Sequence, residues 1–295
     1  MEYVLEDYDA ALQHILRFGY MKPNLTGVRA KTIFGIMSRY PLEDRFPLLT
    51  RRKVWPKAIW AELLWFLSGS TNNKDLQALG SNIWTPWVSK EFEDKWHYEE
   101  GALGPVYGFQ LRHFGGYYPN KHNEACAKMA GSRSMYGMEG YDQLTAMVNT
   151  LRQDPDSRRN LFSLWNPHDI PKMRLPPCHY TYQVYVEGDR LTGMLTQRSC
   201  DFPVGIPANI QFYSTLTVML AQQVGLRPYE FVHSTADSHI YEDQIPAVEE
   251  YLSRPKTPSP RLELTKADDI TSYTMYSFKL TEYEPQAAIK IPVAV

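Results

Sequence analysis

The chain has 295 residues, 43% of them apolar, which is enough to build a large buried core. Its 31 basic and 33 acidic residues leave a net charge of −2, which excludes a general attraction to nucleic acids or anionic membranes. No stretch of about 18 uninterrupted apolar residues is present, and the acidic start of the chain lacks the pattern of a targeting signal. The scattered cysteines Cys126, Cys178 and Cys200 are too few for a disulfide framework or a zinc site, so we expect a cytoplasmic protein without a metal.

Hydrophobic periodicity predicts both helices and strands in the first half of the chain. Residues 4–18 place apolar side chains at helical spacing, and residues 31–40 are rich in β-forming residues. Residues 57–67 are apolar on nearly all sides, which is typical of a buried helix, yet they include one acid, Glu62. Residues 115–140 are rich in Gly, Ser and Asn and lack sustained periodicity, so they predict an insertion or a long loop.

The second half continues the alternation of helices and strands. In chain order we predict a helix at 141–151, a strand at 160–165, hairpin strands at 180–186 and 190–196, a central buried helix at 209–223, a strand at 230–234, and a helix at 241–253. A proline-rich linker at 255–260 leads into terminal strands. Because neither repeats nor a compositional break occur, we expect residues 1–295 to form a single α/β (α+β) domain. We expect its sheet to be mixed, mainly antiparallel and covered by helices.

Cys178 lies between a rigid Pro-Pro turn and a histidine, directly before a predicted strand. A thiolate held there would be a strong carbon nucleophile, whereas the alternative is an inert buried cysteine. Arginines flank it in sequence, at Arg158 and Arg159 on one side and at Arg198 on the other. Guanidinium groups bind phosphate bidentately and favour a nearby thiolate, although exposed arginines also occur as solvated surface residues.

Other polar residues lie among apolar neighbours, where an unsatisfied polar group would cost about 1 to 3 kcal/mol. They are Asp201, Asn209, His239 and Tyr241. Taken alone, Asn209 is better explained as a structural amide or helix cap than as a residue that reads a base, and His239 is better explained as a core histidine.

Several segments together resemble one family. They are ELLWFLSGSTN (62–72), LGPVYG (103–108), DPDSRR (154–159), PPCHYTYQVYV (176–186), QRSCD (197–201), GIPANI (205–210), DSHIY (237–241) and AIKIPVAV (288–295). In order and spacing they resemble the thymidylate synthase family over nearly the whole chain except residues 115–140. The resemblance implies that family's fold, a homodimer that associates through the sheet, and conversion of dUMP to dTMP with 5,10-methylenetetrahydrofolate as carbon donor and reductant.

The resemblance also implies roles for individual residues. It makes Cys178 the nucleophile that adds to C6 of the pyrimidine. The other catalytic residues that it implies are Glu62, Tyr107, His179, Asp201 and Asn209. The implied nucleotide-binding residues are Gln197, Arg198 and Ser199, with Arg158 and Arg159 donated across the dimer to the phosphate, Asn209 at the base, and His239 and Tyr241 at the sugar. The implied folate-binding residues are Arg52, Ile83, Trp84, Trp87, Asp201, Gly205, Ala208 and the C-terminal Val295.

The chain departs from the family pattern at a few of these places. Leu25 stands where a phosphate-binding arginine is usual, with Arg29 four residues later. Ala208 replaces a phenylalanine before Asn209, Thr85 replaces an acid after Trp84, and Arg52 replaces a lysine near the folate tail. These departures leave Cys178 unaffected but bear on the substrate and the product.

Three functions therefore remain open from the sequence. The leading hypothesis is thymidylate formation. The closest alternative is a 5-hydroxymethylase acting on dUMP, or less favourably on dCMP or CMP, in which water replaces hydride. Asn209 favours uracil, because an enzyme for cytosine is expected to carry an acid there. A nucleotide-binding protein without catalysis is the third, disfavoured because the implied catalytic residues are present.

Overall fold

The computed structural model describes residues 4–5, 7–24, 27–121 and 139–293. The chain divides into two compact units. Unit 1 comprises residues 1–56, 178–266 and 276–295, and unit 2 comprises residues 57–177 and 267–275. No helix in the described ranges is both long enough and apolar enough to cross a lipid bilayer.

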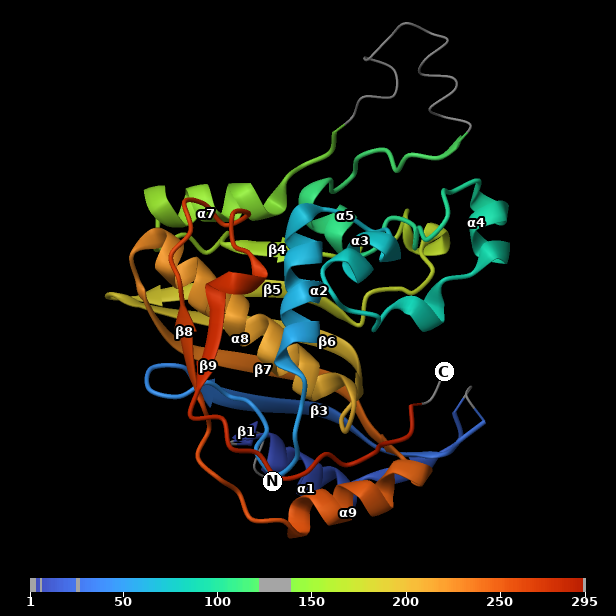
Figure 1. The fold of residues 1–295 in the computed structure, drawn as a ribbon, viewed down its shortest axis with the longest axis vertical. Helices are drawn as coiled ribbons and strands as arrows, with labels where there is room; N and C mark the ends of the chain where they lie inside the picture. Colours follow the sequence, from blue (N-terminus) through green and yellow to red (C-terminus); the bar gives the residue numbers. More distant parts are fainter. Residues whose placement is uncertain (1–3, 6, 25–26, 122–138, 294–295) are drawn as a thin grey trace, which may run out of the picture. The chain divides into compact units, whose positions relative to one another are not determined.

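Unit 1 is built on a mixed β-sheet. Its strands are β1 (Val4–Leu5), β2 (Tyr20–Lys22), β3 (Ala30–Pro41), β5 (His179–Glu187), β6 (Arg190–Asp201) and β7 (Arg227–Tyr241). The order is β1-β3-β7-β6-β5, with β2 also on β3. The β2–β3, β3–β7 and β5–β6 pairs are antiparallel, whereas β1–β3 and β6–β7 are parallel. The mixed sheet predicted from the sequence is confirmed (Figure 1).

The β5–β6 hairpin forms where the alternation of side chains predicts it. Tyr182, Val184 and Val186 are buried, and the intervening Tyr185 is exposed, so one face of β5 points into the core. Gly188 closes the turn with a φ of 62°, a left-handed conformation that glycine adopts without steric cost. Both strands extend beyond the predicted ranges.

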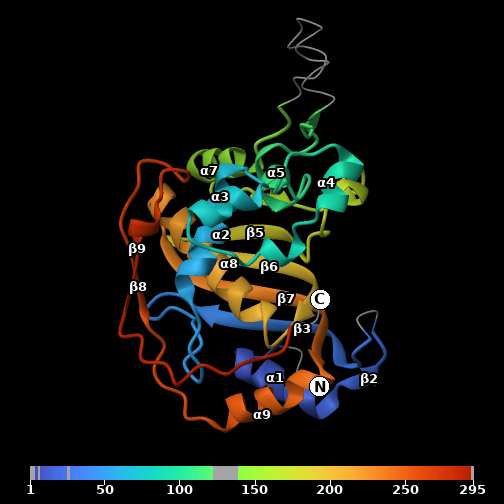
Figure 2. The same cartoon turned by 45° about the vertical axis from the view of Figure 1, so that its right-hand side comes forward.

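The helices of unit 1 are α1 (Tyr8–Phe18), the 3-10 helix η3 (Glu242–Gln244), α8 (Gly205–Val224) and α9 (Ile245–Ser253). The predicted helix at 4–18 is wrong in its first turn, because Asp7 caps α1 by accepting a hydrogen bond from the amide of Ala10 at 3.0 Å. The rings of Tyr8 and Tyr251 meet edge to face, with centroids 5.7 Å apart. This contact joins α1 to α9, which lie side by side in Figure 2.

Helix α8 packs on β6 and β7 and forms the centre of the core in this unit (Figure 1). The Tyr213 ring lies 5.3 Å from that of Tyr182 on β5 and 6.3 Å from that of Phe231 on β7. The helix begins four residues before the predicted start at Asn209. A separate antiparallel pair, β8 (Arg261–Leu264) and β9 (Phe278–Thr281), supplies the predicted terminal strands.

Strand β7 is the largest departure from the predicted elements. A strand was expected only at 230–234, followed by a helix from 241, but β7 runs to Tyr241 and α9 starts at Ile245. The polar segment from Ser234 to His239 satisfies its backbone groups by pairing with β3 on one side and β6 on the other. Tertiary pairing therefore overrides the low strand propensity of these residues.

Unit 2 is mainly helical. Its α-helices are α2 (Pro56–Ser68), α3 (Asn73–Ala78), α4 (Lys90–Trp96), α5 (Tyr107–Arg112) and α7 (Gln143–Gln153), and its 3-10 helices are η1 (Thr85–Trp87) and η2 (Ile170–Lys172). The first residue of α2 belongs to unit 1, and the 3-10 helix η4 (Met275–Ser277) begins at the last residue of unit 2. The short strand β4 (Leu161–Ser163) follows α7. The predicted buried helix at 57–67 and the helix at 141–151 are confirmed within two residues. Of the predicted insertion at 115–140, residues 122–138 lie outside the described ranges.

Candidate active site

The thiol of Cys178 lies beside the guanidinium group of Arg198 in unit 1. Cys178 directly precedes β5, and its carbonyl oxygen accepts a hydrogen bond of 2.8 Å from the amide of Arg198 on β6. The same pairing brings Nη2 of Arg198 within 4.0 Å of Sγ. Cys178 is half-buried, so its sulfur is both held by the sheet and within reach of a ligand. The adjacent positive charge stabilises the negative charge that the sulfur gains when it loses its proton.

The second described cysteine, Cys200, has a different environment from Cys178. Cys200 is fully buried, and burial raises the pKa of its thiol far above the ordinary range, so it is unreactive. Cys126 lies outside the described residues. Among the described cysteines, Cys178 is thus the one with a nucleophile's surroundings.

The strand register gathers several predicted residues near the same end of the sheet. It places these residues opposite each other: His179 with Gln197, Ser199 with Asp237, and Asp201 with His239. His239 Nδ1 lies 3.1 Å from the carbonyl oxygen of Asp237, and Tyr241 ends the strand with its hydroxyl 3.5 Å from the amide nitrogen of Asn24. Residues far apart in sequence therefore meet because β5, β6 and β7 are neighbours.

Asn209 lies at the start of α8 and is held by Gln197. Nε2 of Gln197 donates to Oδ1 of Asn209 at 3.1 Å and to the carbonyl oxygen of Ser199 at 3.0 Å. Gly205, the first residue of α8, leaves space beside this amide, since a Cβ atom there would be 3.9 Å from Oδ1 of Asn209. Ala208 is half-buried on the same turn.

His179 is a neutral, buried histidine. Its Nδ1 lies 2.7 Å from the hydroxyl of Tyr213 on α8. Burial, with a smaller contribution from nearby His233, lowers the pKa of His179 to about 3. It therefore orients or relays through hydrogen bonds near neutral pH and does not carry a charge.

Asp201 is linked to the C-terminal segment through Gln244. Nε2 of Gln244 donates to both carboxylate oxygens of Asp201, at 3.2 and 3.3 Å, and to the carbonyl oxygen of Pro292 at 3.0 Å. Burial raises the pKa of Asp201 above its ordinary value. Val295, predicted to contact folate, lies outside the described residues.

Two arginines of unit 1 have contacts that the sequence does not indicate. Arg52 is buried, and its Nη2 donates to the carbonyl oxygen of Pro203 at 2.8 Å while its Nε lacks a hydrogen-bond partner. Its contact with folate stays a prediction. Arg29 forms an exposed ion pair with Glu242, and Leu25, the departure that precedes it, lies outside the described residues.

In unit 2, Glu62 and Trp84 form the central polar contact. Nε1 of Trp84 donates to Oε1 of Glu62 at 2.5 Å. Glu62 as a residue is only half-buried, yet its carboxyl group is enclosed, and this desolvation raises its pKa to about 7 against the lowering effect of the indole hydrogen bond. The group therefore exchanges a proton near neutral pH.

Aromatic rings surround Trp84 within the same unit. The ring of Tyr107 lies 5.8 Å away, edge to face, and that of Trp87 lies 5.7 Å away. Tyr107 is also stacked on Phe66 at 4.8 Å. Ile83, the remaining predicted residue of this group, is half-buried. Trp84, Trp87 and Tyr107 thus belong to one aromatic cluster.

Arg158 and Arg159 follow α7 on an exposed turn of unit 2. Neither forms a salt bridge with another residue in the described ranges. Their guanidinium groups are thus available to an anionic ligand.

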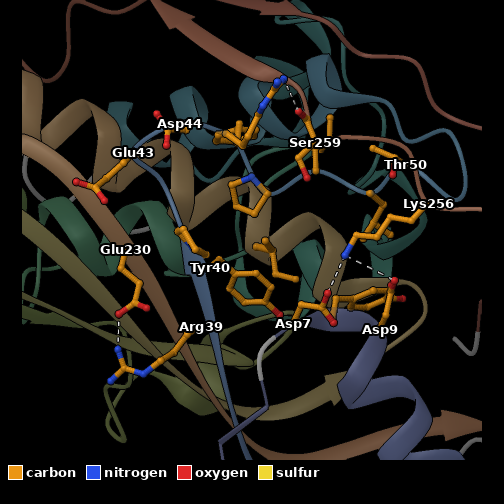
Figure 3. A pocket seen from close by; sticks show the side chains of 18 of the residues that line it. Asp7, Asp9, Arg39, Tyr40, Glu43, Asp44, Thr50, Glu230, Lys256 and Ser259 are labelled. Atoms are coloured by element: carbon orange, nitrogen blue, oxygen red, sulfur yellow. Dashed lines mark hydrogen bonds and ion pairs between the residues drawn. The ribbon is translucent and has the colours of Figure 1, made fainter.

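A hollow of about 680 Å³ lies in unit 1 (Figure 3). Apolar residues such as Tyr40 and Phe46 line it together with charged side chains. Some of these charges are paired, Lys256 with Asp7 at 2.7 Å and Arg39 with Glu230. None of the predicted catalytic or binding residues lines this hollow, and we assign no chemistry to it.

The sequence did not indicate three polar residues that hold the site together. They are Tyr213, His233 and Gln244, which bind His179, Gln197 and Asp201 respectively. Tyr213 follows Asn209 by one helical turn, so the sequence could have placed it on the same face of the helix. The partners of His233 and Gln244 depend on strand pairing and chain packing, which the sequence does not show.

The fold and the site define a class of protein: a mixed α/β fold with a thiol beside a guanidinium group in one unit and a carboxyl group of raised pKa in the other. Among the described residues, no three His, Cys, Asp or Glu side chains are grouped to hold a metal ion. The model of the thymidylate synthase family matches residues 6–295.

Individual relatives agree with the family model. The chain is 43% identical over 293 residues to the thymidylate synthase of Herpesvirus ateles, covering 98% of this chain and 97% of that one. It is 41% identical over 292 residues to the thymidylate synthase of Homo sapiens, covering 98% and 90%. It is also 41% identical over 288 residues to the bifunctional dihydrofolate reductase-thymidylate synthase of Zea mays, covering 96% of this chain and 53% of that one. The chain belongs to the thymidylate synthase family and is an enzyme that transfers a one-carbon group.

Proposed function

We propose that this enzyme converts dUMP to dTMP with 5,10-methylenetetrahydrofolate, and that Cys178 is its nucleophile. The observation that carries the proposal is the position of the Cys178 sulfur, half-buried and 4.0 Å from Nη2 of Arg198. Family membership supports the reaction. The relatives described above carry thymidylate synthase in their names, and no observation favours the hydroxymethylase.

In this reaction the sulfur of Cys178 bonds to C6 of uracil and makes C5 nucleophilic. When bound, the folate supplies the methylene carbon and the hydride. C5 then loses its proton, and the bond between sulfur and C6 breaks to release the product. Arg198 stabilises the thiolate at the start and at the end of this sequence.

We assign the proton transfers of the reaction to side chains whose pKa values fit them for this role near neutral pH. Glu62, with a pKa of about 7, is the residue that exchanges a proton with the pyrimidine, through water. His179 remains neutral and, held by Tyr213, orients that water. Tyr107 is the third residue of this proton-transfer set, and its ring lies edge to face against that of Trp84. Asn209 reads the pyrimidine edge, and His239 and Tyr241 bind the sugar hydroxyl.

The described residues fit a folate in most respects. Trp84 and Trp87 provide flat apolar surfaces, and the Asp201 carboxylate suits the amino and ring N–H groups of a pterin. Ile83, Gly205 and Ala208 add apolar or open positions, and we include Val295 in the folate site on the resemblance alone. Arg52 fits less well, because its guanidinium group is buried on Pro203.

The same proposal includes a homodimer in which Arg158 and Arg159 of each subunit join Arg198, Ser199 and Gln197 of the other at the phosphate. The exposed Tyr185, on the face of β5 that points away from the core, supports association through the sheet. Mixing Cys178→Ser chains with Arg158→Ala chains should restore activity, because one mixed site would contain both intact groups. No recovery after demonstrated subunit exchange would contradict the shared site.

Product analysis tests the reaction itself. The enzyme is incubated with dUMP or dCMP and 5,10-methylenetetrahydrofolate, and nucleotides and folates are separated. We expect dTMP and dihydrofolate in equal amounts from dUMP alone. A 5-hydroxymethyl nucleotide without dihydrofolate would contradict the proposal. We place the enzyme in the cytoplasm, in keeping with its few scattered cysteines.

A further inference from the structure

We propose that His233 is a positioning residue that fixes base specificity, by locking the Gln197 amide and through it the Asn209 amide into the orientation that recognises uracil. This inference rests on the proposed function. The three residues form a chain in unit 1: His233 Nε2 lies 3.0 Å from Oε1 of Gln197, and Nε2 of Gln197 lies 3.1 Å from Oδ1 of Asn209.

The direction of this chain is set by a single backbone carbonyl. The side-chain amide of Gln197 has one end 3.0 Å from the carbonyl oxygen of Ser199, which can only accept a hydrogen bond. The nitrogen of the amide must therefore lie at that end, and its oxygen must face His233. Because that oxygen only accepts, His233 must carry its proton on Nε2.

The surroundings of His233 support this assignment. The residue is 1% exposed and lies in β7 beside the ring of Phe231 at 5.5 Å. Burial lowers the pKa of His233 to about 3, so it is neutral near pH 7 and has one ring N–H to donate. Gln197 is also buried, so an amide oxygen without this donor would lose its partner without gaining water.

The orientation of the Gln197 amide in turn fixes the orientation of the Asn209 amide. The second hydrogen on Nε2 of Gln197 requires the oxygen of Asn209 to face it, which directs Nδ2 elsewhere. An amide fixed in this way presents an acceptor and a donor in the order that matches N3–H and O4 of uracil. Cytosine has the reverse order, an acceptor at N3 and a donor at N4, and would need the flipped amide. The imidazole thus favours uracil without touching the nucleotide.

The first test is the tautomer of His233 in the wild-type protein, measured by two-bond ¹⁵N–¹H correlation and assigned by comparison with His233→Gln. We expect a neutral ring protonated on Nε2 between about pH 5 and pH 8. A ring protonated on Nδ1, or a charged ring, would overturn the inference. This readout needs no turnover, so it stands even if the enzyme proves to have another activity.

The second test compares substitutions at the same position. His233→Phe keeps an aromatic ring but removes the donor, and His233→Gln restores an N–H. We expect His233→Phe to lower the ratio of dUMP to dCMP affinity, measured by calorimetry without folate, by about tenfold to a hundredfold, and His233→Gln to recover most of it. An unchanged ratio in a folded His233→Phe protein would overturn the inference.

Tyr182→Phe is the matched control. It also removes a buried hydrogen bond in unit 1, the 2.8 Å contact between the Tyr182 hydroxyl and Thr217, but lies outside the chain of amides. We expect it to reduce stability while leaving the affinity ratio unchanged. An equal change of the ratio in Tyr182→Phe would show a general packing effect and overturn the role of His233. Failure of wild-type enzyme to form dTMP would instead contradict the proposed function.

Discussion

The contact between Trp84 and Glu62 allows a quantitative prediction. Enclosure of the Glu62 carboxyl group raises its pKa from the ordinary 4.5 to about 7, and the indole N–H, 2.5 Å from Oε1, opposes that rise. Trp84→Phe removes the donor while keeping an aromatic ring against Trp65, Trp87 and Tyr107. A hydrogen bond to a charged group contributes about 1.5 to 3 kcal/mol. Since one pH unit corresponds to about 1.4 kcal/mol, the pKa of Glu62 should rise by about one to two.

The assay is infrared titration of the wild-type, Trp84→Phe and Glu62→Gln proteins without ligands. The band of the protonated carboxyl that is absent from Glu62→Gln identifies the residue. Because the folded pKa lies above the ordinary value, ionising Glu62 costs folding free energy. The stability linked to this group is therefore greatest below about pH 4.5 and is lost as the pH rises through about 7. An unchanged or lowered pKa in Trp84→Phe would refute the assigned hydrogen bond.

Further predictions concern the nucleophile, the base and the chain end. Cys178→Ser should abolish turnover but preserve dUMP binding, because a hydroxyl is nearly isosteric but far less nucleophilic; steady-state rates within tenfold of wild type would contradict this. Asn209→Asp should shift preference from dUMP toward dCMP and cost about 1 to 3 kcal/mol on dUMP, and equal kinetic constants on both nucleotides before and after the change would remove Asn209 from base recognition. Gln244→Leu should free the segment at Pro292 and raise the KM for folate more than that for dUMP, and equal changes in both constants would argue against the link to Asp201. Deleting Val295 should lower dTMP and dihydrofolate in step and raise 5-hydroxymethyl product, and a fall of dTMP and dihydrofolate without any gain of 5-hydroxymethyl product would refute its role in excluding water.

The sequence predicted the elements whose patterns are local. The alternation in β5 and the turn at Gly188 were enough for the hairpin, and the apolar run at 57–67 was enough for α2. The polar end of β7 was missed because Ser234 to His239 are stabilised as a strand only by pairing with β3 and β6, which no local pattern reports.

The same distinction applies to the site. Motifs carried the resemblance and hence Cys178, Arg198 and Asn209, but the partners that orient them come from distant segments. Gln244 meets Asp201 across 43 residues of sequence and Pro292 across 48, and His233 meets Gln197 across 36. Their identities follow from hydrogen bonds that exist only after the sheet has formed. Arg52 illustrates the converse, since its expected place near the folate tail does not reveal that the carbonyl oxygen of Pro203 binds its guanidinium group.

The central claim is that Cys178 bonds covalently to the pyrimidine. The most direct measurement is mass spectrometry of the enzyme after incubation with 5,10-methylenetetrahydrofolate and 5-fluoro-dUMP. In this nucleotide fluorine replaces the C5 hydrogen that must leave as a proton, so the covalent intermediate cannot break down to product. We predict a stable adduct containing both molecules, located on the peptide that carries Cys178 and absent from Cys178→Ser. No adduct, or one on a peptide carrying Cys126 or Cys200, would contradict the account.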